Sequence, residues 1–211
     1  MNNMKILSKS ENLKQEYCCS IIKVGTLKPI EGSDFLAQTF IGDASIVVRK
    51  DQVKEGDLMF YASNECQLSE KFLSANNLFE IGCYEKNSNA SEVKELLDAA
   101  ERCEVELSKD CTKEEAESLR NERDAYKAKA KTKCGFFSHS GRVRMIRLKK
   151  TPSMGYLFSK DEMAKYCPKA KDINMEDYLN VDFDTVDGEL FVKAYVPPVK
   201  ECGSRGEKKN K

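Results

Sequence analysis

The stretch VKEGDLMFYA, residues 53 to 62, shows the plan on which the first part of the chain is built. A Glu-Gly-Asp turn precedes a short apolar run from Leu58 to Ala62. The segments before it repeat this plan, with turn residues at 32–34 and 42–43 and with β-branched residues in CCSIIKVGTLKPI, residues 18–30. Short strands at a spacing of about ten residues predict a sandwich or a small barrel.

A short helix is expected after these strands, because Leu68, Phe72 and Leu73 share one helical face. The apolar residues from Leu78 to Tyr84 then predict another strand. A short helix between late strands is typical of the five-stranded OB-fold. The predicted fold class is therefore mainly β, an OB-like small barrel.

Residues 85 to 133 have a helical pattern and no Pro or Gly. Asn89 with Glu92, and Thr112 with Glu115, have the spacing of helix N-caps. The pattern predicts a helical hairpin inserted at about 85–133, with much of its second helix facing water.

The C-terminal part returns to a β pattern. GRVRMIRLKK (141–150) predicts a strand, SMGYLFS (153–159) its partner, and KDEMAKYC (160–167) a short helix that ends before a proline. We expect residues 1–17 to form a flexible leader, residues 18–198 to form the OB-like domain, and residues 199–211 to form a basic linker or tail.

Several functional classes are disfavoured by composition. The nine cysteines are odd in number, form no Cys-x-x-Cys pair, and are accompanied by one histidine, His139, so we predict no metal site. The N-terminus lacks the apolar region of a signal peptide, and no run approaches the roughly 20 apolar residues of a membrane span. We expect a cytoplasmic protein with reduced thiols and no membrane partner.

The formal net charge of zero conceals a local asymmetry. Acidic residues crowd into 92–124, whereas 127–150 contains no acid. The basic residues of that second segment are Lys127, Lys129, Lys131, Lys133, Arg142, Arg144, Arg147, Lys149 and Lys150. Local basic blocks of this kind favour an anionic partner.

The segment Thr185-Val186-Asp187-Gly188-Glu189 resembles a damaged ligase active site, in which a lysine of Lys-x-Asp-Gly attacks ATP. A threonine cannot replace that amine nucleophile. Asp-Gly is also a strong hairpin-turn signal. Glycine-rich phosphate loops are absent as well, so we predict no catalytic residue in this chain.

The candidate nucleic-acid-binding residues are Arg142, Arg144, Arg147, Lys149 and Lys150. Arg142 and Arg144 are expected on one face of a strand, and the others extend the charge toward the next turn, although strict alternation fails at Ile146. Nearby aromatic residues that can stack on bases are Phe136, Phe137, Tyr156 and Phe158. The alternative is that these aromatic residues form core and that the arginines pair with the acidic helices.

Three stretches in order resemble the N-terminal region of an RNA ligase family that has phage-encoded members. They are VVRKDQVKEGDLMFYASNECQLSEKFLSANNLF (47–79), GRVRMIRLKKTPSMGYLFS (141–159) and DFDTVDGELFVKAYVPP (182–198). Members of this family carry an OB-type domain ahead of a nucleotidyltransferase domain. The resemblance covers roughly residues 20–198.

This resemblance implies an N-terminal domain that engages RNA or a nicked duplex for end joining, nick sealing or repair. The family's adenylylated lysine lies downstream of the segment that resembles 182–198, so Thr185 is not a lost nucleophile. ATP and Mg²⁺ are implied for the full-length family but not for this chain, which we expect to be inactive alone, truncated within a linker or paired with a catalytic domain in cis or trans. The alternative is a stand-alone protein-interaction or structural module that uses its helical insertion.

Overall fold

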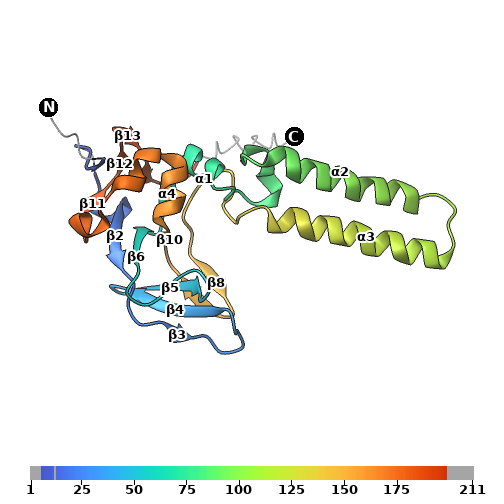
Figure 1. Cartoon of the computed structure of the whole chain (residues 1–211), viewed down its shortest axis with the longest axis horizontal. Coiled ribbons are helices and arrows are strands. Elements are labelled where there is room, and N and C mark those ends of the chain that lie inside the picture. The colour runs from blue at the N-terminus through green and yellow to red at the C-terminus, as the bar shows by residue number, and fades with distance from the viewer. Residues whose placement is uncertain (1–5, 12, 199–211) are drawn as a thin grey trace, which may run out of the picture.

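The computed structural model describes residues 6–11 and 13–198 and combines sheets with helices (Figure 1). Among these residues the longest strands, β4 (Leu36–Ile41) and β5 (Ala44–Arg49), have six residues each. The helices α2 (Ala90–Leu107) and α3 (Lys113–Thr132) have 18 and 20 residues. The chain is therefore a mixture of α and β structure, and the expected mainly β class is not confirmed.

Shorter elements make up the rest of the described fold. The strands are β1 (Leu7–Ser8), β2 (Cys19–Lys23), β3 (Lys28–Pro29), β6 (Leu58–Ala62), β7 (Cys66–Leu68), β8 (Ile146–Leu148), β9 (Thr151–Ser153), β10 (Tyr156–Phe158), β11 (Asp182–Phe183), β12 (Thr185–Val186), β13 (Glu189–Leu190) and β14 (Val192–Ala194). The helices are α1 (Glu70–Ala75), α4 (Lys160–Tyr166) and the 3₁₀ turns η1 (Gln15–Tyr17), η2 (Ile81–Lys86), η3 (Pro168–Asp172) and η4 (Met175–Tyr178).

The central sheet has the antiparallel order β10-β6-β2-β11. Its buried face meets α1 and the C-terminal segments in a core of aromatic rings. Phe158, for example, stacks on Phe60 with ring centroids 5.2 Å apart and tilts over Phe72 at 4.9 Å. We call this sheet with its core and the packed segments around it the body.

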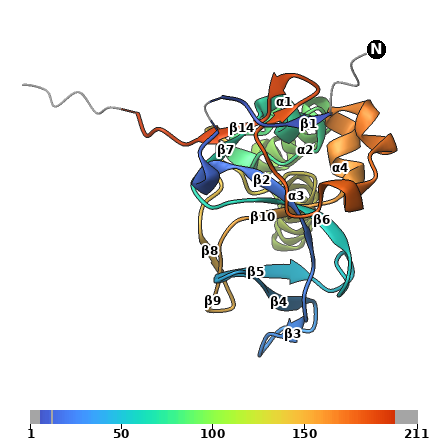
Figure 2. The same cartoon turned by 90° about the vertical axis from the view of Figure 1, so that its left-hand side faces the viewer.

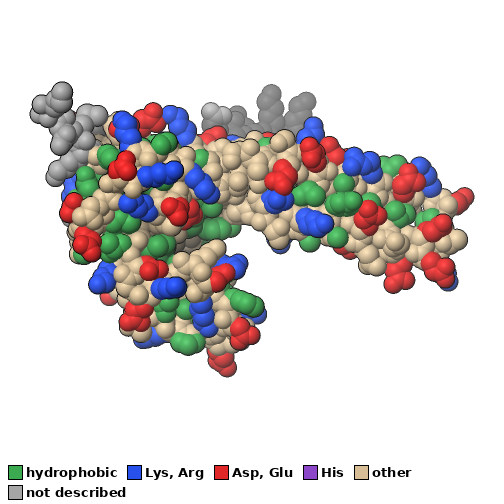
Figure 3. All heavy atoms as spheres, viewed as in Figure 1, with side chains coloured by type: hydrophobic (Ala, Val, Ile, Leu, Met, Phe, Trp, Pro, Cys, Tyr) green, Lys and Arg blue, Asp and Glu red, His purple; other side chains and the backbone are tan. Residues whose placement is uncertain are grey.

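A second unit, the lobe, consists of the sheet β3-β4-β5 and the hairpin β8–β9 (Figure 2). It has its own apolar cluster, which includes Ile46 and Val48 of β5 and Met59 of β6. The expected turn at residues 42–43 is confirmed, because β4 and β5 pair up to Ile41 and Ala44. In space-filling view a notch separates the lobe from the helical hairpin (Figure 3).

The strands do not close into a barrel. Hydrogen bonds join the described strands into five separate sheets, each of them open. The predicted partner of β8 was the segment 153–159, but only Ser153 of that segment pairs with β8; the other partners are Thr151 and Pro152 of β9, and β10 pairs with β6 of the body. The tight turn at residues 149–150 sets the pairing of β8 with β9, whereas the sequence pattern placed the partner strand further along the chain.

The antiparallel helices α2 and α3 project away from the body as a long hairpin, within the expected range of 85–133 (Figure 1). Thr112 and Glu115 form the expected capping box at the start of α3. Asn89 occupies the N-cap position of α2, but its side chain makes no capping bond and donates to the carbonyl of Lys133 at 2.9 Å. That bond joins the two helices at their base.

The start of the described chain is tied to its far end. Leu7 and Ser8 pair with Val186 and Thr185, and the Leu7 side chain is buried in the core of the body. The expectation of a flexible leader is therefore wrong for these two residues. Residues 199–211, the expected basic tail, lie outside the described residues.

The segment from Leu78 to Tyr84 is not the strand that its apolar residues suggested. It contains an isolated bridge at Phe79 and then turns into η2. The side chain of Asn87 fixes this turn, because it accepts from the Phe79 amide and donates to the Phe79 carbonyl, both at 3.0 Å. A β-carbon at Gly135 would lie 2.2 Å from the Leu78 carbonyl oxygen, so only glycine allows the neighbouring chain to approach.

Candidate nucleic-acid interface

The basic segment GRVRMIRLKK is divided between the body and the lobe. Residues 141–143 lie beside β7, where the Val143 amide donates to the Cys66 carbonyl at 2.8 Å. Residues 146–148 form β8 in the lobe. The expected single strand is therefore wrong, and the connection at 144–145 explains why alternation failed at Ile146.

Arg142 is occupied within the body. Its guanidinium forms an ion pair with Glu65 and lies 4.6 Å from the centre of the Tyr195 ring. The expected alternative, in which the arginines pair with the acidic helices, is not what this contact shows, since Glu65 precedes β7. We infer that Arg142 joins β7 to the C-terminal segment and is not free for a ligand.

The other four predicted residues are exposed around the hairpin β8–β9. Arg144 precedes β8, Arg147 lies on it, and Lys149 and Lys150 form its turn. Both lysines have the left-handed backbone conformation, with φ of 49° and 68°. Within the described ranges, these four side chains make no ion pair or hydrogen bond with the protein.

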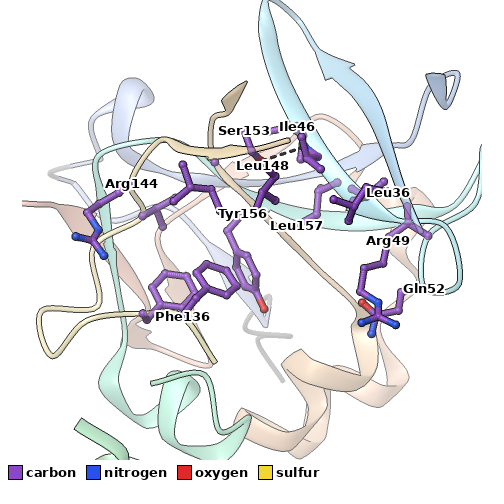
Figure 4. Close-up of a pocket in the computed structure, with 17 residues that line it drawn as sticks. Leu36, Ile46, Arg49, Gln52, Phe136, Arg144, Leu148, Ser153, Tyr156 and Leu157 are labelled. Atoms are coloured by element: carbon purple, nitrogen blue, oxygen red, sulfur yellow. Dashed lines mark hydrogen bonds between the residues drawn. The ribbon is translucent and has the colours of Figure 1, made fainter. Parts of the chain in front are cut away.

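Arg144 and Arg147 do not share one surface. Ile146 and Leu148 line a cavity beneath the hairpin, so strand alternation directs the intervening Arg147 to the opposite, outer face. Arg144 lies at the opening of the cavity (Figure 4). The basic residues therefore surround the hairpin and do not form the single face that was expected.

Buried serines hold the hairpin against β5. The Ser45 hydroxyl donates to the Pro152 carbonyl at 2.7 Å, and the Ser153 hydroxyl accepts from the Val47 amide at 3.0 Å. Both serines are buried. Because buried polar groups are costly unless they are paired, these bonds fix the position of the basic hairpin.

The cavity has a volume of about 320 Å³ and lies between β5, the hairpin β8–β9, β10 and the segment 136–144 (Figure 4). Most of its walls are apolar. Its lining residues are Leu36, Ile46, Val47, Val48, Arg49, Gln52, Val53, Phe136, Phe137, Val143, Arg144, Ile146, Leu148, Ser153, Gly155, Tyr156 and Leu157. None of them is acidic.

The four aromatic residues singled out from the sequence have different roles. Phe137 and Phe158 are buried core residues, as the alternative interpretation had it. Tyr156 is largely enclosed, and its hydroxyl donates to Glu162 at 3.1 Å; burial and then this carboxylate raise its pKa well above the usual value. Phe136 is different, because 49% of it is exposed.

Phe136 is nevertheless held in place by other rings. Its centroid lies 4.8 Å from that of Phe137 in a stacked arrangement and 5.7 Å from that of Tyr156 in an edge arrangement. Such contacts orient a ring without burying it. Phe136 is thus a half-exposed, fixed aromatic ring at the opening of the cavity.

The Thr185–Glu189 segment is a structural hairpin. The Asp187-Gly188 turn joins β12 to β13 with φ of 51° and 83°, which confirms the expected tight turn. Thr185 donates to the Ser8 carbonyl at 2.8 Å, and Asp187 is paired with Lys169 at 2.8 Å. Thr185 and Asp187 thus each have a structural contact in this hairpin.

The buried thiols are poorly suited to nucleophilic chemistry. Burial raises the pKa of Cys66 to about 11 and that of Cys18 to about 12, and it also raises the pKa of Cys19. The reactive species of cysteine is the thiolate, which is scarce at neutral pH when the pKa is raised.

Sequence reasoning missed the residues of β4 and β5 that line the cavity. Ile46 and Val48 read as ordinary strand residues, and nothing in the sequence singled out Gln52, which follows β5. Only the fold brings them next to Phe136 and Arg144, about ninety positions later in the chain. Ser45 carried no signal either, since a serine in a strand is unremarkable without its partner.

No family model matches the chain, and no curated protein matches it. Solved structures of an RNA ligase from Naegleria gruberi are similar to it. The ligase with PPi is 12% identical, with a TM-score of 0.41, over 90% of this chain and 37% of that chain. A variant with ATP and Mn is 15% identical, with a TM-score of 0.42, over 86% of this chain and 36% of that chain.

The chain thus spans little more than a third of the length of the ligase chains that it matches. Neither the fold nor the activity of this chain follows from a similarity of this size. No helix in the described ranges has the length and apolar character needed to cross a bilayer.

Proposed function

We propose that this chain is the N-terminal, OB-type domain of an ATP-dependent RNA ligase, which engages RNA or a nicked duplex for end joining, nick sealing or repair. The observation that carries the proposal is the set of four exposed cations around the hairpin β8–β9. Arg144, Arg147, Lys149 and Lys150 have no acidic partner in the described structure.

Cations without protein partners are suited to phosphates. Each phosphate that is neutralised releases condensed counterions, and this release dominates the affinity of proteins for nucleic acids. Residues 127–150 contain no acid that would oppose an approaching phosphate backbone. The serine bonds to β5 also keep the hairpin in place before a ligand binds.

The resemblance of residues 47–79, 141–159 and 182–198 to the RNA ligase family gives the cations a biological context. This chain carries no Lys-x-Asp-Gly sequence. In the proposal, a catalytic domain in cis or in trans supplies the nucleophilic lysine and binds ATP and Mg²⁺. The present domain holds the broken strand near that centre, in the host cytoplasm if the gene belongs to a bacteriophage.

The proposal is tested by the salt dependence of binding to a nicked RNA duplex. The double variant Arg144→Ala, Arg147→Ala should bind more weakly and show a flatter plot of log K against log salt. Because each lost contact changes the slope by about 0.9 for B-form DNA, two contacts should lower its magnitude by roughly 2. Affinity is measured at several salt concentrations, alongside a thermal melt.

The matched control is the double variant Lys94→Ala, Arg102→Ala, which removes two exposed cations from α2. It makes the same change in net charge and should leave the slope near that of the wild type. Equal slopes in all three proteins would overturn the assignment of the interface. Failure of the wild type to bind RNA at low salt would favour the protein-interaction module.

A further inference from the structure

The cavity under the hairpin β8–β9 is of the right kind for a small planar group. Its volume of about 320 Å³ is at the lower end of the roughly 300–1,000 Å³ typical of ligand pockets. Ile46, Val48, Leu148 and Leu157 supply apolar walls. A small group with largely apolar faces, such as an aromatic ring system, fits walls of this kind.

The opening of the cavity carries polar and positively charged side chains. Arg144 and Phe136 lie on one side of it, and Arg49 and Gln52 lie on the other (Figure 4). Arg49 is already paired with Asp51 at 2.7 Å, whereas Arg144 has no ion pair within the described residues. The free charge at the opening is therefore positive and belongs to Arg144.

Phe136 provides the stacking surface. Contacts with Phe137 and Tyr156 fix its ring, while about half of the residue stays exposed. Aromatic rings held in this way stack on nucleobases without regard to their identity. A fixed ring, an apolar recess and an unpaired arginine thus converge on one opening.

We propose that this cavity receives one unstacked base of a single-stranded RNA segment, such as the strand next to a break, and that Arg144 contacts a phosphate of the same segment. The inference rests on the proposed function and deepens it. A strand is favoured over a free nucleotide because the same hairpin carries two further exposed cations, Lys149 and Lys150, at its turn.

The test compares two ligands of equal charge at one salt concentration. One is a twelve-nucleotide single-stranded RNA, and the other has the same ribose-phosphate backbone with every base removed. Because stacking of one base adds measurably to affinity, the wild type should prefer the intact RNA by about tenfold. Both ligands should retain the contacts between phosphates and cations.

Two variants probe the cavity itself. Phe136→Ala removes the stacking ring, and Leu148→Trp fills the recess; both should lose the preference for bases while their affinity for the abasic strand stays unchanged. The matched control is Phe40→Ala, because Phe40 is 46% exposed on β4 and does not line the cavity. A thermal melt of each variant checks that it is folded. If Leu148→Trp does not fold, Phe136→Ala alone tests the loss of the preference for bases.

The outcomes separate the two proposals. Equal affinity of the wild type for both strands would overturn the base-binding inference and leave the proposed function standing. A preference that survives in Phe136→Ala would also overturn it, by placing the bases elsewhere. Equally tight binding of free AMP would overturn the assignment to a strand. No binding of either strand at low salt would refute the proposed function itself.

Discussion

The body and the helical hairpin of this molecule are stabilised in different ways. The body buries large rings from distant parts of the chain, including Phe60, Phe158 and Phe191, each at most 1% exposed. The hairpin buries only small or medium residues, such as Val93, Ala100 and Ala130. Along its length, exposed ion pairs such as Lys127 with Glu104, at 2.6 Å, join the two helices.

This difference shows where the stability of the molecule resides. Burial of a large aromatic side chain contributes several kcal/mol, whereas an exposed ion pair contributes about 0–1 kcal/mol. The hairpin persists because helices of 18 and 20 residues satisfy their own backbone groups. The body depends on long-range packing, so its loss should unfold the molecule, while the tip of the hairpin should be dispensable.

The largest effect is expected from Phe158→Ala in the body. Its side chain is fully buried between Phe60 and Phe72, so the substitution leaves a cavity and should lower the free energy of unfolding by about 3–5 kcal/mol. Leu119→Ala, on the half-buried face of α3, is the matched truncation and should cost less than about 1.5 kcal/mol. Urea unfolding of both variants measures the contrast, and similar losses would mean that the hairpin is as integral as the body.

An intermediate effect is expected where the two regions meet. Asn87→Ala removes both buried hydrogen bonds to the backbone of Phe79 and leaves the Phe79 amide unpaired, at a cost of about 1–3 kcal/mol, whereas the Phe79 carbonyl still accepts from the Gly135 amide at 3.0 Å. Asn174→Ala, an exposed asparagine in contact with Asp177, should change stability little. A thermal melt that is identical for Asn87→Ala and Asn174→Ala would show that the base of the hairpin does not support the body.

The smallest effect is expected from removal of the hairpin tip. Replacing residues 104–123 by a four-residue Gly-Ser linker should change the free energy of unfolding by only about 1 kcal/mol, because it removes exposed ion pairs and shortens a surface loop. The larger deletion of residues 87–131 would also remove Asn87 and should lower the free energy of unfolding by about 1–3 kcal/mol more, because the Phe79 amide loses its buried partner. Calorimetry of the two deletions locates the boundary between the regions.

The sequence predicted best those elements that local chemistry determines. The capping box at Thr112, the Asp187-Gly188 turn and the helix that ends before Pro168 all depend on neighbours within a few residues. Pairing between strands was predicted less well. The segment from Leu78 to Tyr84 had the composition of a strand but lacks a continuous partner, because Asn87 and Gly135 draw its backbone into a turn.

The candidate interface was predicted only in part, because its arrangement also depends on contacts between distant segments. The charge of residues 142–150 was visible in the sequence, but its division between body and lobe depends on contacts with Glu65 and with Ser45. Exposure separated Phe136 from the buried Phe137, although the two are adjacent and chemically identical. Periodicity cannot distinguish two such neighbours when the chain around them forms no regular element.

The pairing of β1 with β12 has a consequence for how the protein is made. Ser8 and Thr185 are 177 positions apart, so Leu7 cannot reach its place in the core until Thr185 has left the ribosome. At typical synthesis rates that delay is roughly 9–35 s. Throughout this interval Leu7 is without its native partner, and the helical hairpin has time to form first. Native closure of the body therefore follows translation of nearly all the described chain.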